Sequence, residues 1–426
     1  MDSLGVYVHI PFCVQKCVYC DFLSGPATRQ RHQEYVEALK REIERESAEY
    51  AEFEVKTIFF GGGTPSILEA EEIGGILDCI REHYRLDPNA EISMELNPKT
   101  AAGDKLTELR KAGINRLSIG LQSADNAELK LLGRIHTYED FCRTYYQARE
   151  AGFRNINIDL MSGLPGQHME SWVQTLKNVL ALQPEHISAY SLIIEEGTRL
   201  YDRLDEYPPI PDEEEDRQMY QETKRILAEY GYSRYEISNY AKKGYECRHN
   251  MIYWQRGVEH IADYVGFGLG AASTVKKKRW RNTSDMEQYL HAFCPEKHFG
   301  RREPGQQDSQ RLSAAEKNRK EDIGFQPQSN RNLSKEESGK QTIKEDVEEL
   351  SINDCMAEYM FLGLRMMCGV SKAEFAESFS KSMDEVYGAV LHQWIEQGML
   401  IQEGGSIRLT DAGIDVSNVV LAEFLL

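Results

Sequence analysis

The first half of the chain alternates short apolar runs with longer segments in which apolar residues recur every three or four positions. The short runs are typical of buried strands, and the longer periodic segments are typical of amphipathic helices. A strand followed by a helix, repeated along this half, predicts an α/β fold with a parallel sheet curled into a partial (β/α)6 barrel. The expected strands are 6–10, 56–60, 90–96, 116–121, 155–161 and 186–192, and the expected helices are 29–50, 69–84, 102–112, 125–132, 138–151 and 170–182.

Beyond the barrel pattern the composition changes twice. Residues 294–348 are dense in charged and amide side chains, so they cannot bury enough surface to order themselves, and we expect a flexible polar insertion without catalytic groups. Residues 349–426 predict a small α+β domain that is winged-helix-like, with helices at 350–368, 372–379 and 383–397 and strands at 399–402 and 406–410. Residues 1–290 then form the barrel domain, and about 196–290 are an extension of it.

Composition narrows the possible functions. The chain has 426 residues and a formal net charge of −19, which disfavours a nucleic-acid binder because phosphate contacts need basic surface. No stretch approaches the roughly 18 apolar residues of a membrane span, and the N-terminal residues do not have the pattern of a signal peptide. Nine cysteines in a chain of this length suit a reducing compartment better than a disulfide scaffold, so we expect a cytoplasmic protein.

Three of the cysteines form one compact array. Cys13, Cys17 and Cys20 stand in a C-x3-C-x2-C spacing directly after the first expected strand. Thiolates are the ligands that suit iron–sulfur clusters and zinc. A structural zinc site needs four closed ligands, and Asp21 and Phe22 offer no fourth thiol, so the spacing favours a [4Fe–4S] cluster with one iron open to an exogenous ligand. The alternatives are three buried cysteines, or a zinc site with a distant fourth ligand.

Polar and glycine-rich residues follow the ends of the expected strands, where barrel enzymes hold their active sites. The segment 61–65, Gly-Gly-Gly-Thr-Pro, follows the second strand, and Glu95 lies at the end of the third. Asp159 is an isolated acid inside an apolar strand, and it needs a cation or a ligand as its partner because a buried unpaired carboxylate is costly. The structural alternatives are a tight turn for the glycines and a surface position for Glu95.

The cysteine spacing, with the aromatic Tyr19 before the last cysteine, resembles the signature of the radical S-adenosylmethionine (SAM) enzymes. This resemblance implies a [4Fe–4S] cluster on Cys13, Cys17 and Cys20, whose open iron binds the amino and carboxylate groups of SAM. A low-potential electron, supplied by an electron donor, then splits the sulfonium of SAM to give a 5′-deoxyadenosyl radical. No further residue is assigned a catalytic role.

Further residues match the branch of this family around oxygen-independent coproporphyrinogen III oxidase. The glycine segment would hold the amino group of SAM, and Glu95 would accept hydrogen bonds from its ribose hydroxyls. Gln122, Arg134 and Asp159 would line a nucleotide or second-SAM region. The SAM-binding residues that the resemblance implies are Tyr7, Tyr19, Gly62, Gly63, Thr64, Glu95, Gln122, Arg134 and Asp159.

The chain departs from the coproporphyrinogen-oxidising branch at two places. Those enzymes carry a further cysteine two residues after the last cluster ligand, and here that position is Phe22. They also have a longer N-terminal extension that closes over the substrate, whereas Cys13 lies close to the start of this sequence. Without that extension, the means of enclosing a porphyrinogen is in doubt.

A second motif, Cys-Arg-His-Asn-Met-Ile-Tyr-Trp at 247–254, resembles a haem-chaperone branch of the same family. His249 is a candidate axial ligand for haem iron, and Tyr253 and Trp254 offer flat apolar area for a porphyrin face. The alternatives are that His249 caps a turn, that Trp254 belongs to the core, or that Cys247 supplies a thiolate instead. The resemblance implies haem as a further cofactor and haem-accepting apoproteins, including membrane-associated ones, as partners.

Two hypotheses about function follow. In the first, which the sequence favours, the chain is a haem carrier that keeps a SAM-binding cluster and delivers haem to acceptor proteins. In the second, it is a radical SAM enzyme that oxidatively decarboxylates the propionate side chains of coproporphyrinogen III. His249, Phe22 and the position of Cys13 favour the carrier, and the sequence leaves enzymatic activity undecided.

Overall fold

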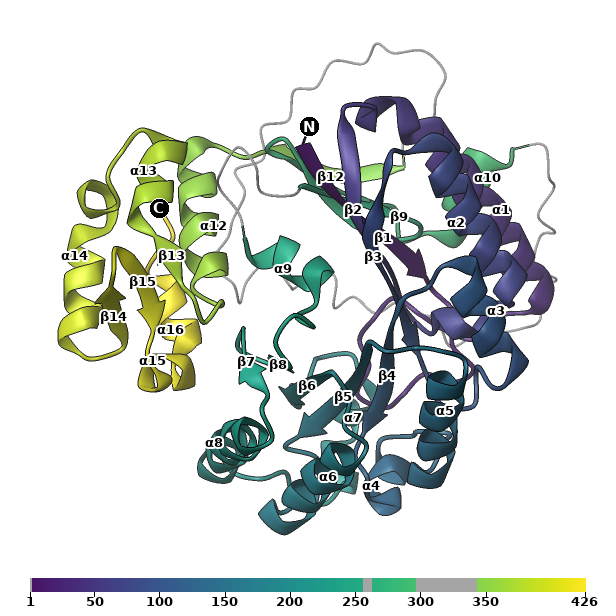
Figure 1. Ribbon diagram of the computed structural model, residues 1–426, viewed down its shortest axis with the longest axis horizontal. Coiled ribbons are helices and arrows are strands. Elements are labelled where there is room, and N and C mark those ends of the chain that lie inside the picture. Colours follow the sequence, from purple (N-terminus) through teal and green to yellow (C-terminus); the bar gives the residue numbers. More distant parts are fainter. Residues whose placement is uncertain (1, 256–262, 296–342) are drawn as a thin grey trace.

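The computed structural model describes residues 2–255, 263–295 and 343–426. Its centre is a sheet in which six strands follow one another in chain order and pair in parallel (Figure 1). These strands are β1 (Asp2–Ile10), β2 (Phe53–Gly62), β3 (Leu86–Leu96), β4 (Arg116–Gln122), β5 (Ile156–Ser162) and β6 (His186–Ser191). The predicted α/β fold with a partial barrel is therefore confirmed.

Helices alternate with these strands along the chain and lie on the outer side of the curled sheet (Figure 1). Several begin at a residue whose side-chain oxygen accepts a hydrogen bond from a backbone amide of the first turn, as at Thr28, Asp125 and Thr137. These caps explain why the helix boundaries lie within a few residues of the predicted ones. The helices are α1 (Arg29–Glu46), α2 (Ala70–His83), α3 (Asp104–Ala112), α4 (Asn126–Leu131), α5 (Tyr138–Glu150) and α6 (Met169–Ala181).

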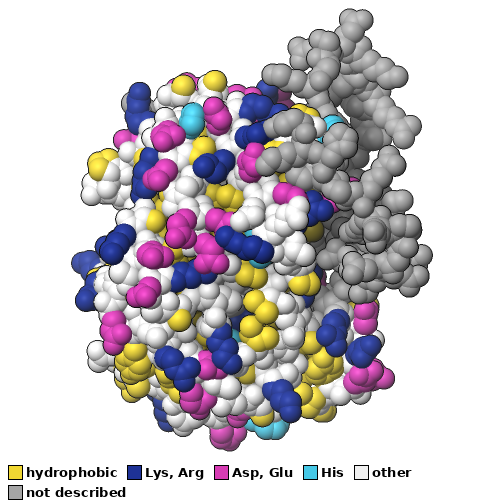
Figure 2. All heavy atoms as spheres, turned by 90° about the vertical axis from the view of Figure 1, so that its right-hand side faces the viewer, with side chains coloured by type: hydrophobic (Ala, Val, Ile, Leu, Met, Phe, Trp, Pro, Cys, Tyr) yellow, Lys and Arg dark blue, Asp and Glu magenta, His cyan; other side chains and the backbone are white. Residues whose placement is uncertain are grey.

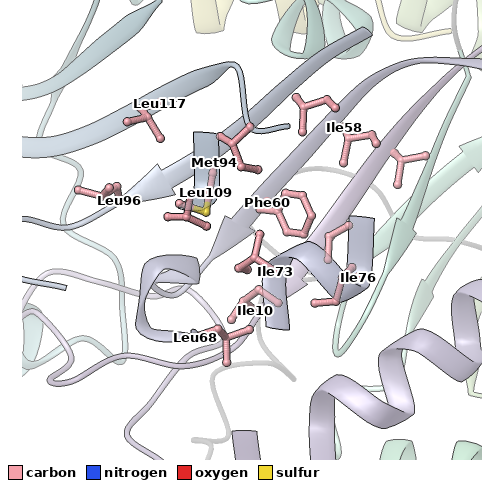
Figure 3. Close-up of a cluster of buried hydrophobic side chains, with 14 of the residues drawn as sticks. Ile10, Ile58, Phe60, Leu68, Ile73, Ile76, Met94, Leu96, Leu109 and Leu117 are labelled. Atoms are coloured by element: carbon pink, nitrogen blue, oxygen red, sulfur yellow. The ribbon is translucent and has the colours of Figure 1, made fainter. Parts of the chain in front are cut away.

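Every second side chain of the strands points outward, toward the helices, and forms the main hydrophobic core. Ile58 and Phe60 on β2 and Met94 on β3 are fully buried, and they lie beside Ile73 and Ile76 of α2 (Figure 3). Burial of this apolar face holds the helices on the sheet. It also fixes which strand residues point the other way.

The opposite face of the same strands is polar. The interior of a closed barrel is ordinarily filled by bulky branched side chains. Here the side chains that point into the barrel are polar, and they need hydrogen-bond partners because most of them are buried. The lumen-facing residues include Thr57, Glu91, Ser93, Glu95, Arg116, Ser118, Asn157, Asp159, His186 and Ser188.

The sheet continues on both sides of the six parallel strands. Beyond β1 lie β9 (Asp263–Phe267), β10 (Ala272–Val275), β11 (Lys278–Asn282) and β12 (Lys344–Glu349), and beyond β6 lie β8 (Asn239–Ala241) and β7 (Ser233–Arg234). The helices of this extension are α7 (Arg199–Asp202), α8 (Glu213–Glu229), α9 (Arg248–Trp254) and α10 (Met286–Phe293). Helix α9 contacts β2, β9 and the first helix of the C-terminal domain, so it closes part of the open side of the barrel (Figure 1).

Strand β12 corrects the predicted flexible insertion at 294–348. Its residues 344–348 pair with β11 in an antiparallel ladder, although they are mostly charged. Contacts of charged side chains take the place of apolar burial here. Arg279 Nη1 lies 3.3 Å from Glu348 Oε1 in an ion pair, and Lys344 Nζ lies 4.8 Å from the centroid of the Trp280 ring in a cation–π contact. Residues 296–342 of the predicted insertion lie outside the described residues.

The C-terminal segment forms a separate small domain with its own core, centred on Phe375, Phe379 and Tyr387. The predicted helices and strands are present, and β13 is an additional short strand at the edge of the sheet. The ion pair between Arg234 and Asp411, at 2.9 Å, links this domain to the extension. Its elements are α12 (Ile352–Gly363), β13 (Val370–Ser371), α13 (Lys372–Phe379), α14 (Met383–Glu396), β14 (Leu400–Glu403), β15 (Ser406–Leu409), α15 (Asp411–Asp415) and α16 (Ser417–Ala422).

The face that carries the helices α1 to α3 shows acidic and basic side chains interspersed (Figure 2). Several are paired, such as Arg29 with Glu72 and Arg81 with Asp78. On the described part of this face the basic side chains do not gather into one patch (Figure 2). None of the helices in the described residues is long and apolar enough to cross a membrane.

Glu42 on α1 fixes the β9–β11 extension to the helical layer. Its buried carboxyl group accepts hydrogen bonds from the Tyr289 hydroxyl (2.5 Å), the Asn282 side-chain amide (2.6 Å) and the Gly268 backbone amide (2.8 Å). Three donors therefore converge on one carboxyl group. A side-chain amide at this position would turn an N–H group toward at least one of them.

We expect Glu42→Gln to lower the free energy of unfolding by about 1–3 kcal/mol, because it leaves a buried donor without an acceptor. Glu44→Gln, on the exposed side of the same helix, is the matched control and should change this free energy by less than about 0.5 kcal/mol. Urea denaturation followed by circular dichroism measures both. Equal effects of the two substitutions would contradict the role given to Glu42.

Candidate functional site

The cysteine loop leaves the end of β1 and is anchored on both sides. The backbone amide of Cys13 donates to the Gly25 carbonyl (2.9 Å), and the amide of Thr64, just after β2, donates to the Phe12 carbonyl (2.7 Å). Farther along, the amide of Val18 donates to the Leu132 carbonyl (3.2 Å) at the end of α4. These bonds hold the loop at the carboxyl ends of the strands, where the sequence predicted the chemistry to lie.

The three predicted cluster ligands share this loop. Cys13 is buried, Cys17 and Cys20 are half-buried, and none forms a disulfide. Burial, with smaller contributions from the neighbouring Cys17 and Cys13 thiols, raises the pKa of the Cys20 thiol to about 11. Within the described residues, no three His, Cys, Asp or Glu side chains form a set compact enough for a single metal ion. Cysteine thiolates are the ligands of iron–sulfur clusters, so three thiols on one loop suit the donor chemistry of such a cluster.

A chain of hydrogen bonds joins two of these cysteines through the neighbouring strand ends. Thr64 Oγ1 lies 3.5 Å from Cys13 Sγ and accepts from the side-chain amide of Asn97 (2.7 Å). The Arg134 guanidinium donates to Asn97 Oδ1 (2.6 Å) and, through its other nitrogen, to Cys17 Sγ (3.5 Å). We call these five residues the cysteine-loop network. A cation donating to a thiolate ligand would offset part of the negative charge of a bound cluster.

Three of the predicted SAM residues therefore lie at the cysteine loop: Thr64 and Arg134 contact it, and Tyr19 belongs to it. The charges of Arg134 and of the Cys17 and Cys20 thiols act on the Tyr19 phenol, whose pKa is raised mainly by burial. Asn97 was not predicted. It lies two residues after Glu95 at the same strand end, and that position is the only signal that the sequence offers.

Gln122 lies next to the cysteine-loop network. Its backbone has a φ of +75°, and a Cβ placed on Gly120 would approach the Asn97, Arg134 and Gln122 side chains within 3.0–3.2 Å. Residues held in the left-handed region cluster at functional sites because the strain needs support from their surroundings. Gln122 and Arg134 are thus brought together, and the nucleotide or second-SAM region that they would share with Asp159 stays a prediction.

The glycine segment packs tightly against the start of the cysteine loop. Gly62 has a φ of +108°, and a Cβ there would lie 2.5 Å from the His9 ring. A Cβ on Gly63 would lie 2.6 Å from the Phe12 carbonyl oxygen. Only glycine fits both positions, so the structural alternative of a tight turn explains these residues. The SAM contact predicted for Gly62, Gly63 and Thr64 stays a prediction.

A cavity of about 170 Å³ lies inside the partial barrel, and we call it the barrel chamber. It brings together three predicted SAM residues, Tyr7, Glu95 and Asp159, with two predicted haem residues, His249 and Tyr253. Its lining consists of Tyr7, Phe59, Glu95, Arg116, Ser118, Asn157, Asp159, Ser188, Tyr190, His249, Asn250 and Tyr253.

The two acids of the barrel chamber influence each other. Burial raises the pKa of Glu95 to about 8, with a further contribution from Asp159, although the Gly62 backbone amide donates to Glu95 (3.2 Å). Asp159 accepts from the Ser118 hydroxyl (3.0 Å) and from the Asn157 side-chain amide (2.7 Å). Burial raises the pKa of Asp159 as well. The partners of Asp159 are thus neutral donors, where the sequence predicted a cation or a ligand.

Tyr7 connects the barrel chamber to the cysteine loop. The Nε2 atom of His9 donates to the Leu23 carbonyl (3.0 Å), so its Nδ1 atom accepts from the Tyr7 hydroxyl (3.0 Å). Tyr7 also stacks on Phe59 of β2, with ring centroids 6.4 Å apart. The predicted contact of Tyr7 with the cofactor stays a prediction.

His249 lies in the first turn of α9 and is 1% exposed. Its Nδ1 atom is 2.8 Å from Thr57 Oγ1, and its Nε2 atom is 2.8 Å from the Tyr253 hydroxyl. Burial, with the nearby charge of Arg116, lowers the pKa of the imidazole to about 3, so the ring is neutral at neutral pH. Both ring nitrogens have partners, and ligation of haem iron through Nε2 therefore requires the Tyr253 hydroxyl to move away.

Trp254 does not line the barrel chamber. Positions four apart on a helix share a face, which places His249 and Tyr253 together and turns Trp254 away from them. The Arg365 guanidinium lies 4.3 Å from the centroid of the Trp254 indole and covers one face of it. This cation–π contact ties α9 to the segment after α12. The predicted porphyrin-stacking role of Trp254 is therefore not supported by its position.

Cys247, the predicted alternative to His249 as a ligand of haem iron, is fully buried. Its Sγ atom lies 3.5 Å from a carboxylate oxygen of Glu91, and burial raises its pKa to about 12. The thiol stays protonated near neutral pH and faces a carboxylate. These are the properties of a structural cysteine.

Two family models match the chain: the Radical SAM superfamily over residues 7–179, and the HemN C-terminal domain over residues 350–416. Together with a three-cysteine loop at the rim of a partial barrel, these matches define a radical SAM protein. The superfamily implies a [4Fe–4S] cluster and SAM. Among solved structures, coproporphyrinogen III oxidase (HemN) from Escherichia coli superimposes with a TM-score of 0.78, covering 100% of this chain and 90% of that one; at 23% sequence identity this likeness concerns the fold.

The relatives identify the family more closely. The heme chaperone HemW of Bacillus subtilis is 33% identical over 423 residues, which is 99% of both chains. The heme chaperone HemW of E. coli is 42% identical over 276 residues, covering 65% of this chain and 71% of that one. A mouse protein, radical S-adenosyl methionine domain-containing protein 1, mitochondrial, is 38% identical over 268 residues, covering 63% of this chain and 60% of that one. The chain belongs to the HemW family.

We expect Asn97→Ala to weaken cluster binding, because it removes the bridge between Thr64 and Arg134 in the cysteine-loop network. The buried polar groups left without partners should also lower the free energy of unfolding by about 1–3 kcal/mol. Iron and sulfide per chain after anaerobic reconstitution measure the first effect. Asn89→Ala, at the exposed opposite end of β3, is the control, and equal iron and sulfide in the two variants would contradict the role of Asn97.

Proposed function

We propose that this chain is a haem carrier that holds a [4Fe–4S] cluster with SAM and delivers haem to acceptor apoproteins, including membrane-associated ones. The observation that carries the proposal is the barrel chamber, whose lining joins Tyr7, Glu95 and Asp159 to His249 and Tyr253. The full-length similarity to proteins named heme chaperone HemW supports it. We further propose that barrel, extension and C-terminal segment act as the domains of this carrier, and that an electron donor serves the cluster.

The assignment of residues follows from their positions. Cys13, Cys17 and Cys20 would hold the cluster, which with SAM on its open iron supplies one-electron chemistry. Arg134 would offset the charge of the Cys17 thiolate, to which it already donates. At neutral pH Glu95 is largely protonated, since its pKa is about 8, and it can therefore donate as well as accept a hydrogen bond toward a ribose.

On the haem side, the proposal assigns the iron ligand to His249 and the adjacent surface to Tyr253. The imidazole is neutral, which is the form that ligates a metal. Its Nε2 atom becomes available when the Tyr253 hydroxyl, now 2.8 Å away, is displaced. His249 would therefore strengthen haem binding, and the Tyr253 hydroxyl would weaken it. Substituting each residue separately tests this difference.

We expect the anaerobically reconstituted protein to bind haem with a defined Soret band. His249→Ala should shift the band and weaken binding, because the iron loses a ligand. Tyr253→Phe should keep the band and bind haem at least as tightly, because it removes the hydroxyl that occupies Nε2. Absorption titration measures all three proteins, and His83→Ala, on α2, is the matched histidine control.

Two results would contradict this proposal. An unchanged Soret band in His249→Ala, together with a lost band in Tyr253→Phe, would assign the iron to the phenol. Conversion of coproporphyrinogen III to protoporphyrinogen IX, with SAM and a reductant, would replace the carrier with the coproporphyrinogen-oxidising alternative. Chromatography of the porphyrins after oxidation detects that conversion.

A further inference from the structure

Arg116 is the first residue of β4 and lines the barrel chamber, although it is only 1% exposed. Its Nε atom is buried without a hydrogen-bond partner. Within residues 2–255, 263–295 and 343–426, no carboxylate lies within 4.0 Å of its guanidinium, although Glu91 and Asp159 are near enough to act on its charge. A buried guanidinium without a close partner carries a large desolvation cost.

The nearby acids are engaged by other groups. Glu91 accepts from the backbone amides of Arg248 (2.9 Å) and His249 (3.2 Å) at the start of α9. Asp159 accepts from Ser118 and Asn157, as described above. Glu95, the third acid, accepts from the Gly62 amide and has a pKa of about 8, so it is largely neutral at neutral pH.

Four other titratable groups face Arg116 from neighbouring elements. Burial and the charge of Arg116 lower the pKa of the His186 and His249 imidazoles, so both rings are neutral at neutral pH. The thiol of Cys247 and the phenol of Tyr235 both act on the guanidinium through their charges when ionised. Burial raises the pKa of the thiol and of the phenol, so both are neutral at neutral pH. The positive charge of Arg116 therefore lacks a contact partner of opposite charge on every side.

The barrel chamber is closed at the end where Arg116 lies and open at the other. Near Arg116, the Asn157 and Ser188 side chains are each 2% exposed. Toward the carboxyl ends of the strands, Glu95 is half-buried and Tyr190 is 38% exposed. A ligand would thus enter from the side of the cysteine loop and meet the guanidinium last.

We propose that the closed end of the barrel chamber is a carboxylate-binding subsite anchored by the Arg116 guanidinium, and that its occupant is a propionate arm of the tetrapyrrole cargo. A guanidinium binds a carboxylate through two parallel hydrogen bonds, and the Ser118, Asn157 and Ser188 side chains supply polar neighbours. The barrel chamber, with a volume of about 170 Å³, has room for a propionate arm at this end.

The identity of the occupant rests on the proposed haem-carrier function, whereas the carboxylate chemistry rests on Arg116 alone. The test therefore compares haem with haem dimethyl ester, in which both carboxylates are blocked. Each is titrated into the full-length wild type, Arg116→Met and Arg116→Lys, and the exposed-surface variant Arg81→Met is the control. Binding of the ester reports that the haem site is folded in each variant.

We expect the wild type and Arg81→Met to bind haem roughly 10- to 100-fold more tightly than the ester, the range of a charged hydrogen-bonded pair. Arg116→Met should bind both ligands equally, at the affinity that the wild type has for the ester. Arg116→Lys should keep part of the preference, because it retains the charge and loses the two-pronged geometry.

Equal affinity of the wild type for haem and the ester would overturn the inference and leave the proposed function intact. An equal loss of both ligands in Arg116→Met would also overturn it, since the arginine would then be structural. Failure of the wild type to bind either ligand would overturn the proposed function itself, and the propionate assignment with it. In a further outcome, the wild type would bind haem and the ester equally, and millimolar sodium propionate would raise the unfolding temperature of the wild type but not of Arg116→Met. The subsite would then bind a free carboxylate, and the assignment to a tetrapyrrole would be wrong.

Discussion

Successive side chains of a strand point to opposite faces of the sheet, and this alternation governs the whole molecule. Outward residues such as Ile58 and Met94 are buried under the helices. Because side chains alternate along a strand, the residues next to them in sequence point into the lumen. Those neighbours are polar, so they must find partners among themselves. Most do, through bonds such as those between Asp159, Ser118 and Asn157.

The same strand ends also support the cysteine loop. Gly62 at the end of β2 donates to Glu95 of β3, and Asn97 just beyond β3 bridges Thr64 and Arg134. The loop that would hold the cluster and the chamber that would hold its ligands are thus built from the same few residues. We therefore expect a substitution at one of these strand ends to alter both the cysteine loop and the barrel chamber. This coupling is what a protein that uses the cluster and the chamber together would need.

The sequence could predict features that depend on local periodicity. The six parallel strands, the helices between them and the cysteine loop were all visible as patterns, because burial imposes a fixed repeat on strands and helices. It could not place Arg134 against Cys17, because that contact joins segments more than a hundred residues apart. Arg116 looked like an ordinary charged residue at the start of a strand, and its burial became apparent only in the fold.

Two features of the structure differ from what the sequence led us to expect, for physical reasons that composition and motif order conceal. Strand β12 forms from charged residues, because ion pairs with β11 replace apolar burial there. Trp254 belongs to the same short motif as His249 but lies on another side of α9, under the Arg365 guanidinium. A motif gives the order of residues along the chain, and only the helix geometry decides which of them face the chamber together.

The most direct test of a three-cysteine cluster with an open iron is the electron paramagnetic resonance spectrum of the reduced, anaerobically reconstituted full-length protein, recorded without and with SAM. We expect a [4Fe–4S] signal that changes when SAM is added, because the iron without a cysteine ligand gains a new one. A protein that carried stoichiometric zinc in place of iron and sulfide, or a cluster signal that SAM left unchanged, would contradict the open iron.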